Sequence, residues 1–228
     1  MIDAYKQWYV EIDMQGMKAI AKQYDLKVNQ DSDLGPFQWK RRMGIHLAFH
    51  RDPLNIVLHA VFSIVNAWAL LLIFYPFQLS GLNLFSVPLD MAMVILVATF
   101  IIYALMDIGA ALLVTIAFAL TYPLCAPVME LLQGSTGLML ALGIFLTFLA
   151  LAVQVFIGHN IAEKGIDDAV DNFKELFESK NPLYITLLPF YTYLDLLFMA
   201  GYKPKTAQFI WSMTNELRPK LEAEQKNI

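Results

Sequence analysis

The sequence has little charge, and a long central stretch has no positive charge at all. Only 16% of the 228 residues are charged and 58% are hydrophobic, whereas about a quarter of a soluble domain is charged. All sixteen lysines and arginines lie at or before Arg51 or at or after Lys164, eight on each side. This composition is typical of a membrane protein, and the net charge of −4 argues against a nucleic-acid partner.

Cysteine is nearly absent, and no signal peptide is apparent. The one cysteine, Cys125, lies in an apolar run, so no disulfide within the chain and no CxxC metal site can form. The first thirty residues contain no apolar core of signal-peptide length. Their charged and apolar positions instead predict an amphipathic helix and a polar linker over residues 1–36. The helix would lie either on the membrane surface or on the cytosolic face of the protein, and its mixed charge favours the second.

Four apolar stretches predict membrane-spanning helices, because a hydrocarbon layer of about 30 Å requires roughly 20 helical residues. They are residues 54–77, 90–106, 108–132 and 137–158. A weaker apolar segment, 183–202, contains Pro189 and Asp195. We expect it to be interfacial or re-entrant, because a fifth crossing would separate the positive charges that follow residue 163. Four crossings place both ends in the cytoplasm or matrix, as the positive-inside rule requires.

The predicted fold class is therefore all-α, a polytopic membrane protein with a four-helix transmembrane bundle. The N-terminal amphipathic helix precedes it, and an interfacial or re-entrant segment follows it. The membrane-embedded region covers residues 37–202. Residues 203–228 are predicted to form a polar C-terminal helix or tail that frays.

The chain has four histidines, and four crossings place all of them at one membrane level. His46, His50 and His59 precede or begin the first predicted span, and His159 ends the last one. His46 and His50 are four residues apart and share a helical face. Pro53 predicts a break that allows His50 and His59 to converge, since on one straight helix they would be about 13 Å apart.

A carboxylate and an amide accompany these histidines. Glu163 follows His159 by four residues, and Asn55 precedes His59 by four. Two or three imidazoles with one carboxylate and open positions suit non-haem Fe(II). Four histidines are too few for a membrane di-iron site, so a mononuclear site is the upper limit. The alternatives are an amphipathic interfacial side chain for His46, and a helix-end charge paired with Lys164 for Glu163.

The stretches HRDPLNIVLH (residues 50–59) and IGHNIAEK (residues 157–164) resemble motifs of a family of small membrane proteins. This family was long described as a domain of unknown function. Its characterised members are iron-dependent 2-hydroxy fatty acid dioxygenases of phytosphingosine breakdown. Residues His50, Asn55, His59, Gly158, His159 and Glu163 match the family pattern. The sequence departs from it after Glu163, where the family's proline is absent from KGIDDAVDNF.

The resemblance implies an oxidoreductase that shortens 2-hydroxy fatty acids by one carbon (α-oxidation) with Fe(II) and O₂ at the cytoplasmic membrane face. It implies His50, His59 and His159 as metal ligands. His46 is an additional metal-ligand candidate that the family pattern does not include. Glu163 would be a fourth ligand or would orient His159, and Asn55 would bond a ligand or cap the first span. The expected partners are a lipid or fatty-acid substrate and membrane lipids.

A second hypothesis is a non-catalytic structural subunit of a larger membrane complex, built on the same scaffold. A lipid-binding or transporter-like protein is a weaker third. The endoplasmic reticulum would suit the enzyme, and the mitochondrial inner membrane would suit the complex subunit.

Overall fold

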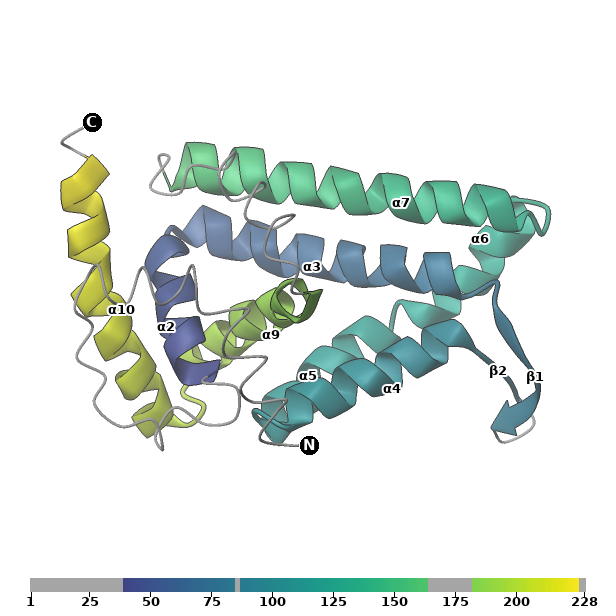
Figure 1. The fold of residues 1–228 in the computed structure, drawn as a ribbon, viewed down its shortest axis with the longest axis horizontal. Helices are drawn as coiled ribbons and strands as arrows, with labels where there is room; N and C mark the ends of the chain where they lie inside the picture. The colour runs from purple at the N-terminus through teal and green to yellow at the C-terminus, as the bar shows by residue number, and fades with distance from the viewer. Residues whose placement is uncertain (1–38, 85–86, 164–181, 226–228) are drawn as a thin grey trace. The chain divides into compact units, whose positions relative to one another are not determined.

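The computed structural model describes residues 39–84, 87–163 and 182–225, and this part of the chain is mainly helical (Figure 1). The helix and linker predicted over residues 1–36 lie outside it. The chain divides into two compact units. We call residues 57–155 the central unit, and residues 1–56 with 156–228 the terminal unit.

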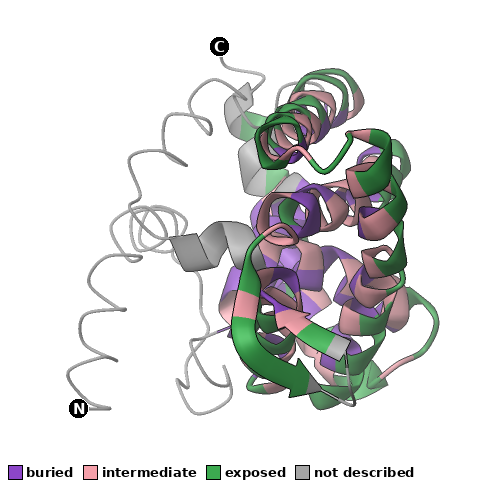
Figure 2. Ribbon diagram, turned by 90° about the vertical axis from the view of Figure 1, so that its right-hand side faces the viewer, coloured by how far each residue is buried: buried purple, intermediate pink, exposed green. Residues whose placement is uncertain are grey.

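The central unit contains most of the apolar helices. Its elements in chain order are α3 (Pro53–Phe74, which begins in the terminal unit), β1 (Gln78–Leu84), β2 (Val87–Asp90), α4 (Met91–Ala104), α5 (Ile108–Ala119), the 3₁₀ turn η3 (Tyr122–Leu124), α6 (Cys125–Leu131) and α7 (Thr136–Val153). The antiparallel hairpin β1–β2, in which Gln78 pairs with Asp90, is not among the predicted elements and is mostly exposed (Figure 2). The fold is thus mostly helical rather than all-α.

Aspartate side chains cap the N-termini of two helices of the central unit, α4 and α5. The Asp90 carboxylate accepts a hydrogen bond from the Met93 amide at the start of α4, and Asp107 accepts from the Gly109 and Ala110 amides at the start of α5. These caps satisfy amides that have no partner within the helix. The cap at Asp107 reverses the chain, so α4 and α5 lie side by side and antiparallel (Figure 1).

The core of the central unit forms where α3 and α7 approach each other closely. A Cβ atom built on Gly143 would lie 2.7 Å from the Ala69 carbonyl oxygen and 2.6 Å from Ile73 Cγ1. Glycine is therefore required at this contact for the two backbones to approach. The fully buried residues around which this core is built are Leu71, Leu72, Ala92, Cys125 and Met139.

Three helical segments are long and apolar enough to cross a membrane: Pro53–Phe74, Ile108–Leu131 and Thr136–Ala162. Of the most apolar 18-residue stretch of the last segment, only 17% is buried inside the protein. Large apolar side chains such as Phe145 and Phe148 are instead exposed. An exposed apolar surface of this extent indicates a membrane protein.

The predicted second span is shorter than expected. Helix α4 has 14 residues, which rise about 21 Å, less than the roughly 30 Å thickness of hydrocarbon. Three of the four predicted spans are thus of full length in the structure.

The terminal unit contains α2 (Trp39–Phe49), the first turn of α3, the π-helix η4 (Gln154–Ala162, which starts in the central unit), α9 (Pro182–Met199) and α10 (Pro204–Gln225). Helix α10 packs along α2 (Figure 1), and Leu217 of α10 is fully buried. The C-terminal segment is therefore packed against the rest of the terminal unit at Leu217, where the sequence predicts a polar helix or tail that frays. The segment predicted to be interfacial or re-entrant forms the continuous helix α9, which buries Phe190, Tyr191 and Leu194.

Candidate metal site

The site begins at a break between α2 and α3. Helix α2 ends at Phe49, and α3 begins with Pro53. Proline is favoured at the first helical position because it has no N–H to satisfy. The Asp52 carboxylate accepts a hydrogen bond from the Leu54 amide at 2.8 Å and so caps the new helix. The chain turns here, as Pro53 predicts, and places His50 just before the turn.

His50 is oriented by the helix that precedes it. Its Nδ1 lies 2.7 Å from the backbone oxygen of His46. With a proton on Nδ1 the ring donates to this carbonyl, which leaves the lone pair on Nε2, the arrangement that suits a metal ligand. The His46 ring stacks on the His50 ring with centroids 3.8 Å apart, and it also lies 5.6 Å from the Tyr191 ring. His46 thus supports His50 on one side.

His159 reaches the same place from the π-helix η4. A π-helix closes its hydrogen bonds over five residues, is rare, and occurs mostly at functional sites. Here the Glu163 amide donates to the Gly158 carbonyl at 3.1 Å. The His159 ring stands edge-on to the His50 ring, with centroids 4.6 Å apart and planes at 88°. Two histidines separated by more than a hundred residues are therefore in ring contact, and both are buried.

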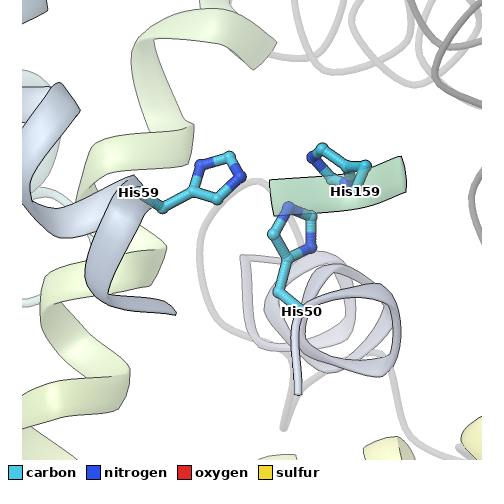
Figure 3. A group of neighbouring side chains, drawn as sticks. All are labelled: His50, His59 and His159. Carbon is cyan, nitrogen blue, oxygen red and sulfur yellow. The ribbon is translucent and has the colours of Figure 1, made fainter. Parts of the chain in front are cut away.

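The third histidine of the group comes from α3. One ring nitrogen from each of His50, His59 and His159 lies within 4.8 Å of the others (Figure 3). The helix runs without a break from Pro53, so His59 lies one turn beyond Asn55 on the same face. The three histidines are all buried and each offers one nitrogen. Within the described part of the chain, this group does not include His46 or Glu163.

Both carboxylate oxygens of Glu163 accept hydrogen bonds from other segments of the chain. Its Oε1 accepts from the Asp52 amide at 2.7 Å and from Asn55 Nδ2 at 3.2 Å. Its Oε2 accepts from a guanidinium nitrogen of Arg218 at 2.9 Å. Because both oxygens are engaged and the carboxylate is buried, this geometry suits a residue that holds the histidine-bearing segments together.

Asn55 has one engaged and one unengaged polar atom. Its Nδ2 donates to Glu163, whereas its Oδ1 is buried without a hydrogen-bond partner among the described residues. Buried polar atoms are nearly always satisfied, so an unsatisfied acceptor one helical turn before His59 suits a site that takes up a further group. Asn55 is not the cap of α3, because Asp52 has that role.

Arg218 is the residue that sequence reasoning missed. It lies in α10, within a stretch of mixed charges that predicts only a solvated helix. Its partner Glu163 is 55 residues away, and no spacing pattern relates the two. The one available signal is physical: a buried carboxylate requires a partner of opposite charge.

Comparison of the chain with protein-family models, with curated protein sequences and with solved structures gave no match.

Proposed function

We propose that this protein is a membrane-embedded, non-haem iron dioxygenase that shortens 2-hydroxy fatty acids by one carbon. The observation that carries the proposal is the convergence of His50, His59 and His159, whose nitrogens lie within 4.8 Å of one another in a buried site. The motif resemblance described above supplies the substrate class, and the apolar helices supply a surface for an acyl chain.

The donor set fits a divalent first-row metal. Three imidazole nitrogens suit Fe, Zn, Cu or Ni, and an incomplete ligand set with open positions is the pattern of non-haem iron oxygenases. The unpartnered oxygen of Asn55 adds an acceptor for a bound hydroxyl or water. A bound Fe(II) ion would supply the activation of O₂, and His50, His59 and His159 would hold it.

The protein's own residues would orient and shield the reacting groups. The His46 carbonyl fixes the tautomer of His50, and Glu163 fixes the Asn55 amide through its hydrogen bond. In this role Glu163 is a positioning residue rather than a ligand. An α-hydroxy acid has a hydroxyl that can donate to Asn55 Oδ1 and an acyl tail that can remain among apolar side chains.

The topology we propose has four crossings, with α4 as the second, and both termini on the cytoplasmic or matrix side. It is supported by the absence of lysine and arginine between Arg51 and Lys164. The short α4 would be accommodated by local thinning of the bilayer, which costs fractions of a kcal/mol per Å of mismatch. The endoplasmic reticulum is the membrane that fits the enzymatic proposal.

Metal analysis tests the proposal. The full-length protein is purified in detergent under reducing conditions, and its iron content is measured beside those of His159→Ala and His46→Ala. We expect about one iron per chain in the wild type, a loss in His159→Ala, and a smaller loss in His46→Ala, which keeps the carbonyl that His50 contacts but removes the ring that stacks on His50. Oxygen-dependent shortening of a 2-hydroxy fatty acid, followed by mass spectrometry, should parallel the iron content.

A wild-type protein that folds but binds no iron would contradict the proposal. That result would favour the alternative of a non-catalytic subunit of a larger membrane complex. Iron binding without turnover on any 2-hydroxy fatty acid would contradict the substrate class alone.

A further inference from the structure

The Arg218 side chain of α10 donates hydrogen bonds to residues that lie far from it in the sequence. One guanidinium nitrogen of Arg218 lies 2.9 Å from Glu163 Oε2 and 2.9 Å from the backbone oxygen of Ala48. Ala48 is two residues before His50, and Glu163 is four residues after His159. Arg218 therefore joins the two backbone segments that present these histidines.

The position of Arg218 is itself fixed by the packing of α10 on α2. The Thr214 hydroxyl, one turn earlier on α10, donates to the Gly44 carbonyl at 3.0 Å. A Cβ atom built on Gly44 would lie 3.0 Å from Met213 Cβ, so the two helices are in close contact here. Since α10 is anchored in this way, Arg218 meets its two acceptors from a defined direction.

The ion pair extends to the break between α2 and α3. Glu163 uses one oxygen for Arg218 and the other for the Asp52 amide and Asn55. The Glu163 side chain has no exposure, whereas that of Arg218 is 19% exposed. A buried carboxylate that loses its cation is strongly destabilised and is expected to turn toward solvent. That movement would release the donors on its other oxygen.

We propose that Arg218 is a positioning residue for the histidine site, acting through Glu163 and the Ala48 carbonyl. This proposal rests on the metal site of the proposed function, but it concerns a residue outside the sequence motifs. Residues that orient metal ligands without binding the metal typically contribute 10- to 100-fold to metal affinity. Arginine is suited to the role because a single guanidinium nitrogen directs two N–H groups in a fixed plane, one to each acceptor, whereas the lysine ammonium is a point charge on a flexible stem.

The test uses Co²⁺ as the probe, with the full-length protein in detergent. Dissociation constants and the visible absorption spectrum of bound Co²⁺ are measured for the wild type, Arg218→Ala, Arg218→Lys and Asn215→Ala. Asn215 is an exposed residue of the same helix and serves as the matched control. The thermal unfolding midpoint of each metal-free protein is measured in parallel, and the Arg218→Ala titration is repeated with added guanidinium.

We expect Arg218→Ala to bind Co²⁺ about 10-fold more weakly with an altered spectrum, and guanidinium to restore both. Arg218→Lys should lie between Arg218→Ala and the wild type, and Asn215→Ala should match the wild type. A purely structural tether would lower the unfolding midpoint and leave the spectrum unchanged.

An Arg218→Ala protein with wild-type affinity and spectrum would overturn the proposal, whatever its unfolding midpoint. If Arg218→Ala does not fold, wild-type binding by Arg218→Lys overturns it in the same way. A wild type that binds no Co²⁺ would instead refute the metal site itself, and the role of Arg218 with it.

Discussion

Two buried carboxylates, one in each unit, serve opposite purposes. Asp107 in the central unit accepts hydrogen bonds from the amides two and three residues ahead of it, at 3.1 Å each. Glu163 in the terminal unit accepts from Asp52, Asn55 and Arg218, of which the nearest in sequence is 55 residues away. The first carboxylate caps the helix that follows it, whereas the second accepts hydrogen bonds from segments that only the assembled fold brings together.

The difference separates a structural region from a candidate functional one. In the central unit, the buried residues Asp90 and Asp107 cap the N-termini of helices, and many large apolar side chains are exposed on the surface. In the terminal unit a buried charge and buried imidazoles depend on contacts that α2, η4 and α10 form together. Long-range polar contacts are costly to assemble, and they are retained where orientation of side chains matters.

The largest expected effect is that of Glu163→Gln. The amide keeps the shape of the carboxylate but loses the charge that pairs with Arg218, and one of its two terminal atoms becomes a donor. We expect the affinity for Co²⁺ to fall about 10- to 100-fold, as measured by titration of the purified protein.

The matched change in the central unit is Asp107→Ala. Loss of a helix cap costs about 1 kcal/mol of stability, and we expect unchanged metal affinity. The contrast between the two units would fail if Asp107→Ala weakened metal binding as much as Glu163→Gln.

A pair of glycines compares the packing of the two units. In Gly143→Ala the new Cβ would meet the Ala69 carbonyl oxygen at 2.7 Å, and this atom belongs to a helix backbone. Such overpacking costs about 1–3 kcal/mol, and we expect a lower unfolding midpoint. In Gly44→Ala the new Cβ would meet Met213 Cβ at 3.0 Å and Cε at 3.1 Å, and it would lie at an ordinary contact distance of 3.4 Å from the Ile210 carbonyl oxygen.

For Gly44→Ala the gain in helix propensity, about 1 kcal/mol, should offset most of the strain. Thermal unfolding in detergent distinguishes the two variants. A larger loss for Gly44→Ala than for Gly143→Ala would show that α2 and α10, rather than α3 and α7, form the less adaptable contact.

A smaller effect is expected for Tyr122→Phe in the central unit. The Tyr122 hydroxyl donates to Asp90 Oδ2, and so ties the start of α4 to η3. Its removal should cost about 1 kcal/mol in denaturant or thermal unfolding. Iron content should equal that of the wild type, since Asp90 takes no part in the histidine site, and a loss of iron would contradict this assignment.

The smallest expected effect is a gain in thermal stability when Asp195 in α9 is replaced by asparagine. Burial raises the pKa of this carboxyl above its ordinary value, although the Trp211 N–H at 3.0 Å and the charge of Arg51 act in the opposite direction. The folded state therefore holds the proton more tightly than the unfolded chain, and stability falls as pH rises from the unfolded pKa to the folded pKa.

Asp195→Asn keeps an acceptor for Trp211 and removes the charge. We expect its unfolding midpoint at pH 7 to rise by about 2 °C. The advantage should shrink as the pH is lowered through that interval and the wild-type carboxyl takes up its proton. A variant that is less stable than the wild type at pH 7 would show that the ionised carboxylate is favourable.

Periodic and compositional features of the fold were predictable. Long apolar runs predict α3, α5 with α6, and α7, because helix length and hydrocarbon thickness are simply related. Pro53 predicts the break that allows His50 and His59 to converge. Helical periodicity also predicts that Asn55 and His59 share one face of α3.

Features that depend on contacts between distant segments were not predictable. The hairpin β1–β2 lacks strict alternation of apolar and polar residues, so its sequence gives no strand signal. The tie from Arg218 to Glu163 joins positions with no shared motif. The π-helical pattern of η4 also has no signature in the sequence IGHNIAE, where the spacing of His159 and Glu163 was interpreted on α-helical geometry.

The π-helix has a genetic consequence. A π turn absorbs one residue more than an α-helical turn, and in an α-helix that residue would rotate every later side chain by about 100°. Deleting a single codon between Gln154 and Gly158 would remove the extra residue and leave His159 in alignment with His50, whereas adding a codon there would rotate His159 out of alignment. A single-residue deletion and a single-residue insertion in this short stretch are thus a sensitive pair of probes of the site.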